Sequence, residues 1–297
     1  MSNNKKTIFT GAAVAVITPF KNEKVDYDAL GKIIDFQIEN GTDAIVICGT
    51  TGESSTLSDE EHIEAIAYTV EHTAKRIPVI AGSGSNDTKY AVWLSREAKR
   101  AGADALLQVT PYYNKATAKG LIRHFLTIAE STDLPNILYN VPSRTGCNIT
   151  LPVYRELAKH PNIAATKEAS GNISAIAQLF AECGEDLDVY SGNDDQIVPL
   201  LSLGAKGVIS VLSNVMPKET HEICRLFFEG KISESAKLQL TLLDLINALF
   251  CEVNPVPVKA AMNMMGYCTD EIRMPLCEME DSNLEKLRAV MLRHGLI

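Results

Sequence analysis

Lys167 is the residue whose setting in this sequence most suggests chemistry. It ends the apolar run at residues 163–166, which is bounded by Pro161 and Gly171 and is typical of a buried strand. Burial disfavours a charged ammonium, and a neutral amine is a nucleophile that forms Schiff bases with carbonyl substrates. This segment alone is equally compatible with a structural lysine that reaches solvent. Other residues must decide between the two interpretations.

A short turn after another apolar run offers a place for an anion. Gly49-Thr50-Thr51-Gly52 follows residues 44–48, and its two glycines are expected to free the backbone. Successive amides and hydroxyls could then surround a carboxylate, or alternatively a phosphate. A purely structural turn is the competing interpretation.

Phenol and guanidinium groups follow two further apolar runs. Tyr113 comes after residues 105–110, whereas Tyr139 lies within 136–140 and is followed by Arg144. A phenol beside an amine can move the protons that carbinolamine formation and dehydration require. The planar fork of Arg144 suits a carboxylate. Taken singly, strand-end tyrosines are more often core aromatics, and a loop arginine is more often a solvated charge.

The sequence does not favour metal or serine-hydrolase chemistry. No histidine pair has ligand spacing, and no Gly-x-Ser-x-Gly elbow follows a strand. All six histidines are expected on helical patterns away from the other candidates. They are His62, His72, His124, His160, His221 and His294.

The elements that would position these residues alternate between short apolar runs and amphipathic stretches. Strands are expected at 11–20, 44–48, 78–82, 105–110, 136–140, 187–191 and 207–211, and around Lys167 between Pro161 and Gly171. Helical patterns separate them, one of which opens with the capping box Ser58-x-x-Glu61. Eight such units predict a (β/α)8 barrel, whose active sites lie at the C-terminal ends of the strands.

The runner-up fold is an open doubly wound sheet. The segment Gly82-Ser83-Gly84 lacks the third glycine of a dinucleotide fingerprint, which disfavours this alternative. Residues 231–297 show helical patterns without strands, at 231–252, 257–265 and 282–294. We therefore expect a catalytic barrel at residues 1–230 and a C-terminal helical domain at 231–297 packed on it.

Composition narrows the class of partner and the compartment. The net charge is −9 without a basic cluster, so neither nucleic acid nor an anionic membrane is an expected partner. Seven cysteines without a Cys-x-x-Cys pair are expected to be free thiols in a reducing compartment. Residues 1–7 lack the apolar core of a signal peptide, and no apolar run has the length of a membrane span. A soluble, cytoplasmic protein is expected.

Taken together, these motifs resemble a known family. Gly49-Thr50-Thr51-Gly52-Glu53, residues 139–146 (Tyr-Asn-Val-Pro-Ser-Arg-Thr-Gly) and Lys167-Glu168 resemble the dihydrodipicolinate synthases, within the pyruvate-lysine aldolase superfamily that also contains N-acetylneuraminate lyase. The resemblance covers essentially the whole chain. It implies condensation of pyruvate with L-aspartate 4-semialdehyde, in the diaminopimelate route to lysine. It also implies a covalent imine of pyruvate with Lys167, with no organic cofactor and no metal.

The resemblance further implies a role for each matching residue. Tyr139 would carry protons beside the imine, while Thr50 and Thr51 would hold the pyruvate carboxylate and relay protons. Tyr113 would complete the relay from a neighbouring subunit of a homotetramer built as a dimer of tight dimers. Arg144 would bind the carboxylate of the semialdehyde. Two more positions, Gly192 and Ile209, would line the pyruvate pocket.

Many members of this family are inhibited by lysine in a cleft at the tight-dimer interface. The matching positions here are Ser54, Ser55, Asp59, His62, Asn86, Tyr90 and Tyr112. Asp59 stands where a histidine is often found, and Tyr90 stands where a glutamate would bind the ammonium of the effector. Loss of that anion weakens capture of a cation. Weak or absent feedback by lysine is therefore expected.

Two other functions remain possible from the sequence. An aldolase acting on N-acetylneuraminate or a 2-keto-3-deoxy sugar acid would keep Lys167 and Tyr139. Arg144 favours the semialdehyde, because a polyhydroxylated substrate needs neutral hydrogen-bond partners instead. A barrel that binds a small molecule without turnover is the non-enzymatic alternative. It has no need of an amine beside phenols.

Overall fold

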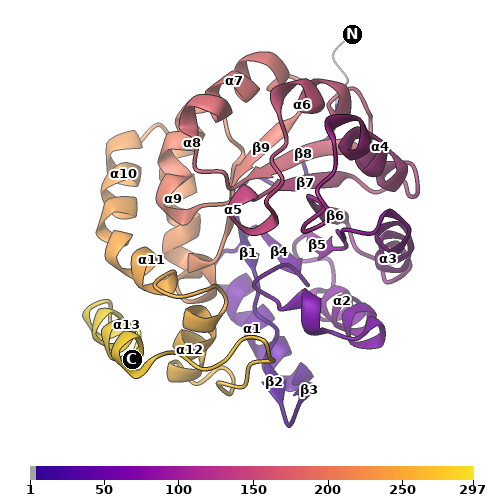
Figure 1. The fold of residues 1–297 in the computed structure, drawn as a ribbon. Coiled ribbons are helices and arrows are strands. Elements are labelled where there is room, and N and C mark those ends of the chain that lie inside the picture. The colour runs from indigo at the N-terminus through magenta and orange to yellow at the C-terminus, as the bar shows by residue number, and fades with distance from the viewer. Residues whose placement is uncertain (1–4) are drawn as a thin grey trace.

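The computed structural model describes residues 5–297, so the first four residues of the predicted N-terminal segment and barrel lie outside the described part. Eight parallel strands close into a barrel in the order β1-β10-β9-β8-β7-β6-β5-β4 (Figure 1). The predicted (β/α)8 fold is confirmed. The strands are β1 Gly11–Ala15, β4 Ala44–Ile47, β5 Val79–Gly82, β6 Ala105–Val109, β7 Asn136–Asn140, β8 Ile163–Glu168, β9 Asp188–Ser191 and β10 Gly207–Ser210.

Helices surround the barrel as an outer ring. They are α1 Tyr27–Glu39, α2 Asp59–Thr73, α3 Thr88–Arg100, α4 Ala118–Ala129, α6 Leu151–Leu157, α7 Ile173–Cys183, α8 Ile197–Leu203 and α9 Pro217–Phe228. The capping box at the start of α2 is confirmed: Ser58 accepts from the Glu61 amide, and the Glu61 side chain accepts from the Ser58 amide. Such local pairing satisfies amides that the helix itself leaves free.

Some small elements were not predicted. The expected strand at 11–20 ends at Ala15, and Phe20–Lys21 (β2) pairs with Lys24–Val25 (β3) as a separate antiparallel hairpin. The segment Pro142–Thr145 forms the short helix α5 at the end of β7. Short 3-10 turns also follow β4, β9 and β10, at Ser54–Thr56, Asp194–Gln196 and Leu212–Asn214.

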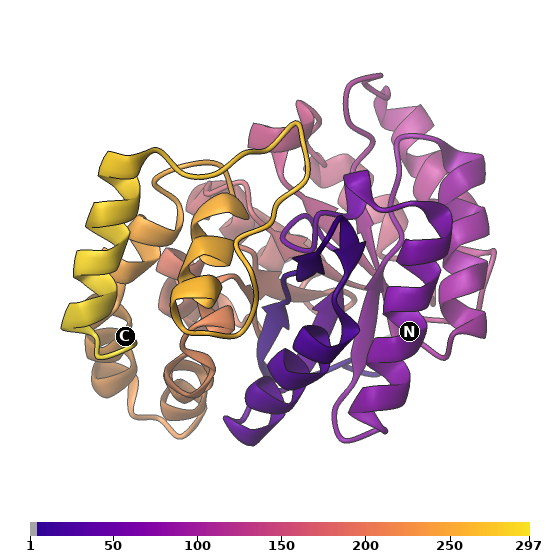
Figure 2. The same ribbon diagram turned by 90° about the horizontal axis from the view of Figure 1, so that it is seen from below.

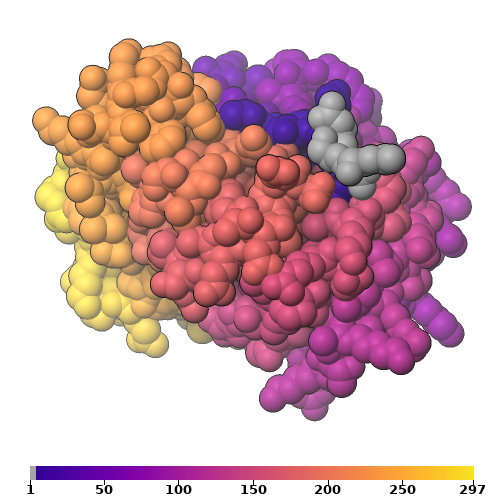
Figure 3. All heavy atoms as spheres, turned by 90° about the horizontal axis from the view of Figure 1, so that it is seen from above, coloured from indigo at the N-terminus to yellow at the C-terminus, as the bar shows by residue number. Residues whose placement is uncertain are grey.

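Four helices follow the barrel: α10 Ile232–Thr241, α11 Leu243–Leu249, α12 Val256–Met264 and α13 Asp281–Arg293. The helical pattern expected over 231–252 is divided into two helices, since the chain turns at Leu242. The two parts pack on different neighbours, because α10 lies against α8 and α9 whereas α11 contacts α12 and α13. In Figures 1 and 3 this C-terminal segment, orange to yellow, lies on the side of the molecule away from α3 and α4.

A long loop ties the C-terminal segment to the start of the barrel. Figure 2 shows the chain before α13 reaching the β2–β3 hairpin. There Thr269 Oγ1 donates to the Phe20 carbonyl, and Arg273 Nη2 donates to the Glu23 carbonyl. No helix within residues 5–297 combines the length and apolarity needed to span a membrane.

The strands divide their side chains between two apolar regions. Ala165, Tyr139, Tyr190 and Ile209 belong to the cluster inside the barrel. Alternate positions on a strand face opposite sides, so Lys167 shares the inner face with Ala165, while Thr166 faces the helices. The amine of Lys167 is thereby aimed into the barrel at the C-terminal end of β8.

Candidate active site

Lys167 is buried at the C-terminal rim of the barrel, with 5% of its surface exposed. It is in register with Tyr139 on β7 and with Tyr190 on β9. Its Nζ lies 4.4 Å from the centroid of the Tyr139 ring. Parallel register therefore places a primary amine over the face of a tyrosine ring at the rim.

The turn after β4 brings Thr51 into the interior. Thr51 is 3% exposed, and its Oγ1 accepts a hydrogen bond of 3.0 Å from Asn254 Nδ2. The glycines do not supply the unusual backbone that the sequence suggested. The left-handed conformations fall instead at Cys48, with φ of 55°, and at Glu53, with φ of 52°.

Gly52 is required for close packing rather than for a positive φ. A Cβ at this position would lie 3.2 Å from Thr18 Oγ1 and 3.2 Å from the Val16 carbonyl oxygen. Contacts this short are tighter than ordinary van der Waals contact, so a side chain would push the turn away from β1. The predicted conformational role of the two glycines was therefore wrong, and Gly52 matters for packing instead.

Arg144 lies in α5, directly beyond β7. Its Nη2 donates to the Asn254 carbonyl over 3.1 Å. With Thr50, Val141 and Thr145, it lines a cavity of about 390 Å³. The residues that line this cavity do not include Lys167 or Tyr139. Two of the residues that line the cavity are close in sequence to buried rim residues: Thr50 precedes Thr51, and Arg144 follows Tyr139 by five residues.

The two positions matched to the pyruvate pocket both lie at the barrel interior. Gly192 follows β9, and a Cβ there would come within 3.1 Å of Lys167 Cε and 2.7 Å of Ala169 Cβ. The missing side chain thus leaves room for the stem of Lys167. Ile209, on β10, is fully buried in the interior cluster.

Tyr113 is not brought to Lys167 within the single chain. Its surface is 91% exposed, and its backbone has φ of 71°. Neighbouring Tyr112 is 40% exposed. A bulky residue with positive φ is uncommon and marks a backbone held by its surroundings.

The seven positions of the predicted effector cleft divide into two groups. Five of them line the same cavity as Arg144: Ser54, Ser55, His62, Tyr90 and Tyr112. Asp59 and Asn86 lie beside it, where Tyr90 Oη donates to Asp59 Oδ1 over 2.6 Å and Asn86 Nδ2 donates to the Tyr112 carbonyl over 3.2 Å. Burial, followed by the hydrogen bond to Asp59, raises the pKa of the Tyr90 phenol.

The expectation that all histidines lie away from the rim was wrong for His62. The side chain lines the 390 Å³ cavity, and its Nε2 lies 2.7 Å from the Gly82 carbonyl oxygen. Burial lowers the pKa of this imidazole, while the carbonyl contact opposes the shift. The helical pattern was correct, but α2 turns His62 toward the end of β5.

Contacts from three residues of the C-terminal segment were not predicted. Asn254 joins Thr51 to Arg144, as described above. Lys259, on α12, forms an ion pair of 2.6 Å with Glu53, and each side chain is only 1% exposed. Glu53 Oε2 also accepts from the Arg273 amide. Because these partners are 110 to 220 residues apart in sequence, no local pattern could have identified them.

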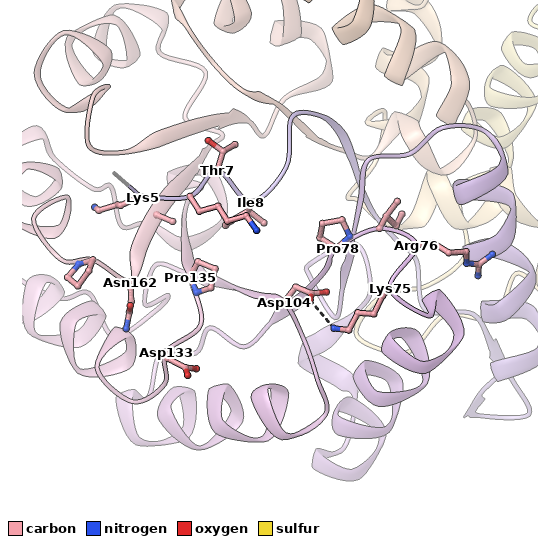
Figure 4. A pocket seen from close by; sticks show the side chains of 14 residues that line it. Lys5, Thr7, Ile8, Lys75, Arg76, Pro78, Asp104, Asp133, Pro135 and Asn162 are labelled. Atoms are coloured by element: carbon pink, nitrogen blue, oxygen red, sulfur yellow. Dashed lines mark hydrogen bonds and ion pairs between the residues drawn. The ribbon is translucent and has the colours of Figure 1, made fainter. Parts of the chain in front are cut away.

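A larger cavity of about 510 Å³ lies at the opposite end of the barrel (Figure 4). It is lined by residues that precede the strands, such as Ile8, Pro78 and Asn162. Two of its cations already have acidic partners: Lys75 Nζ lies 2.9 Å from Asp104 Oδ1, and Arg76 binds Asp35. Active sites of barrels occupy the other end, so we assign the candidate site to the Lys167 rim. Within residues 5–297, no three His, Cys, Asp or Glu side chains are arranged to hold a metal ion.

The fold and the rim define a (β/α)8-barrel protein with a buried amine beside phenol, hydroxyl and guanidinium groups. Residues 8–293 match the model of the dihydrodipicolinate synthetase family. The chain belongs to this family.

Relatives and solved structures agree with this assignment. The chain is 59% identical to a 4-hydroxy-tetrahydrodipicolinate synthase of Lachnoclostridium phytofermentans, over 98% of this chain and 99% of the relative. It is 56% identical to the enzyme of the same name from Acetivibrio thermocellus, over 99% of this chain and all of the relative. A crystal structure of dihydrodipicolinate synthase from Aquifex aeolicus superposes with a TM-score of 0.95 at 48% identity, covering 97% of this chain and 99% of that one.

Proposed function

We propose that this protein condenses pyruvate with L-aspartate 4-semialdehyde to 4-hydroxy-tetrahydrodipicolinate, in the diaminopimelate route of lysine biosynthesis. The single observation that carries the proposal is the buried amine of Lys167, 4.4 Å from the Tyr139 ring centroid, in a member of this family. The names of the relatives above support the same reaction. They do not favour the sialic acid or sugar acid aldolase alternative.

In the proposed mechanism, Lys167 Nζ attacks C2 of pyruvate, and the resulting carbinolamine loses water to give a protonated imine. The imine acts as electron sink, so a base removes a proton from the pyruvate methyl group and leaves an enamine. The enamine carbon then attacks the aldehyde, whose oxygen takes up a proton. Finally the amine of the second substrate attacks C2, which closes the ring and releases Lys167. No cofactor is needed in this sequence of steps.

Each rim residue has a role in this proposal. Tyr139 moves protons at the imine, because its phenol ring lies against Lys167. Thr50 and Thr51 bind the pyruvate carboxylate with their hydroxyls and amides. Arg144 binds the carboxylate of the semialdehyde. Gly192 and Ile209 shape the pyruvate pocket from the ends of β9 and β10, and Gly192 leaves room for the Lys167 stem.

The proposal extends to the assembly and the compartment. The exposed Tyr113 would complete the proton relay in the site of a neighbouring subunit, within a homotetramer of two tight dimers. Residues 231–297 would form a helical domain packed on the barrel of residues 1–230. All seven cysteines are free thiols, as a cytoplasmic enzyme would have them.

Borohydride trapping tests the assigned nucleophile. With pyruvate present, reduction should add about 72 Da, which is pyruvate less water plus two hydrogens, to the peptide that contains Lys167. Lys167→Arg should abolish both the adduct and turnover. No adduct on the wild-type chain, or an adduct confined to another lysine, would refute the mechanism.

Arg144→Ala provides the matched comparison within the same experiment. This variant should still form the adduct but lose condensation by about 100-fold, because a charged hydrogen-bond pair to the semialdehyde is removed. Equal losses in trapping and condensation would contradict the role of Arg144. N-acetylneuraminate cleavage, measured in parallel, should be absent.

A further inference from the structure

Asn254 contacts Thr51 and Arg144, two of the three rim residues that we assign to substrate carboxylates. It lies between α11 and α12 and is 6% exposed. Its side-chain Nδ2 donates to Thr51 Oγ1 over 3.0 Å, while its backbone carbonyl accepts from Arg144 Nη2 over 3.1 Å. A single residue of the C-terminal segment therefore joins the end of β4 to the end of β7.

The hydrogen bond to Thr51 fixes the direction in which that hydroxyl can act. A hydroxyl has one proton to donate and lone pairs to accept with. Because Asn254 Nδ2 occupies an acceptor position of Oγ1, the proton of Thr51 stays available for another group. An anion in the site would take that proton in a charge-assisted hydrogen bond, which is stronger than a neutral one.

The remaining polar atom of Asn254 argues against a purely structural role. Within residues 5–297, its Oδ1 is buried and has no hydrogen-bond partner. A buried acceptor without a partner destabilises a fold. Stability alone would therefore favour an apolar residue of similar shape at this position.

We infer that Asn254 is a positioning residue for pyruvate, which holds the Thr51 hydroxyl as a donor toward the pyruvate carboxylate. The inference rests on the proposed function, and it adds a residue from outside the barrel to the substrate site. It also assigns a task to the segment after α11: this segment sets how Thr51 is presented.

The two contacts of Asn254 can be separated by experiment. Any side chain at position 254 keeps the backbone carbonyl that binds Arg144, whereas only a donor keeps the bond to Thr51. Side-chain variants should therefore weaken the binding of pyruvate and leave the binding of the semialdehyde nearly unchanged. A general loss of structure would affect both substrates alike.

The variants Asn254→Leu and Asn254→Asp test the inference. For each, the extent of borohydride trapping is measured as a function of pyruvate concentration, and KM is measured for each substrate. Both variants should need about tenfold more pyruvate for half-maximal trapping, with the KM of the semialdehyde changed less than about twofold. Asp has nearly the shape of Asn, yet its carboxylate only accepts and takes the Thr51 proton for itself. If Asn254→Leu does not fold, Asn254→Asp provides the same comparison. Wild-type affinity for pyruvate in Asn254→Asp would overturn the inference.

Two further variants isolate the proposed contact. Asn263→Leu makes the same change on α12, where Nδ2 donates to the Cys268 carbonyl over 2.9 Å, and should leave pyruvate affinity unchanged. In a Thr51→Val background, Asn254→Leu should add nothing more, because both changes remove one interaction. Additive effects would overturn the inference.

The outcomes also separate this inference from the proposed function. A wild-type chain that is not trapped refutes the imine mechanism itself. A trapped wild-type chain with unaffected Asn254 variants overturns the role of Asn254 alone.

Discussion

At the residue scale, Tyr90 and Asp59 determine what the cavity beside Arg144 can bind. Tyr90 lines the cavity and directs its hydroxyl to Asp59 Oδ1, which lies 2.6 Å away. The Asp59 carboxylate thus accepts a hydrogen bond from Tyr90, and Asp59 does not line the cavity itself. Buried capture of an ammonium needs a paired anion, since desolvation of an unpaired cation is costly. Tyr90 supplies none.

We predict that L-lysine at micromolar concentration does not inhibit the enzyme, and that Tyr90→Glu introduces inhibition. The glutamate would place an anion in the cavity, which should tighten lysine binding by about tenfold or more. Initial-rate measurements with lysine titrated against both proteins test this. Tyr90→Gln, which has similar size without charge, is the control. Micromolar inhibition of the wild-type enzyme would contradict the prediction.

At the element scale, one histidine links two neighbouring helices of the ring. His124 on α4 is buried, and its Nδ1 lies 2.8 Å from Oγ1 of Thr88 on α3. Its Nε2 is buried without a partner among the described residues. Burial therefore lowers the pKa of His124 to about 4, against a small opposing effect of Asp87.

This depressed pKa predicts acid sensitivity with a definite sign. His124 becomes protonated below pH of about 6.5 in the unfolded chain, but only below about pH 4 in the folded chain. Folding stability therefore falls as the pH is lowered from about 6.5 to about 4. Above pH of about 6.5 this effect is absent. Relative to wild type, His124→Gln should gain about 2 kcal/mol in free energy of unfolding between about pH 7 and pH 5. Urea unfolding at fixed protein concentration measures the difference.

His221 is a matched control of opposite sign. Its hydrogen bond to Asp43 raises the pKa of the imidazole. The protonated His221 therefore stabilises the fold below pH of about 6.5, and this stabilisation is lost as pH rises through the folded pKa. His221→Gln should therefore become less stable relative to wild type as the pH is lowered. The same pH trend in both variants would show that neither reports its own histidine.

At the scale of the whole molecule, Tyr113 is the residue that the single chain leaves out of the site. Its surface is 91% exposed, whereas Lys167, Tyr139 and Thr51 are buried. Symmetric dimers commonly complete a site with a residue from the partner. We therefore predict that a Tyr113→Phe chain and a Lys167→Ala chain, each nearly inactive alone, restore activity when they are assembled together.

Mixed assemblies purified through two different tags test this prediction. The one site with an intact Lys167 would receive Tyr113 from the other chain, so activity should return to about half of wild type. Tyr139→Phe mixed with Lys167→Ala is the control and should remain inactive, because Tyr139 and Lys167 belong to one chain. No recovery in the first mixture would place Tyr113 outside the partner's site.

The sequence by itself determined the features that depend on near neighbours along the chain. Strand and helix alternation predicted the barrel, and the side-chain polarity around Ser58 predicted its capping box. Strand order in a barrel then placed Lys167 beside Tyr139, because the ends of adjacent parallel strands meet at one rim. The break at Leu242 was missed, since it depends on which distant helices α10 and α11 contact.

Only the tertiary structure revealed how the C-terminal segment supports the site. Asn254 reaches Thr51, and Lys259 pairs with Glu53, across more than two hundred residues in each case. Hydrogen bonds and ion pairs of this kind depend on the position of one folded element relative to another, which no periodicity or motif encodes. Lys167 could therefore be recognised from the sequence, whereas the residues that hold its neighbours in place required the packed chain.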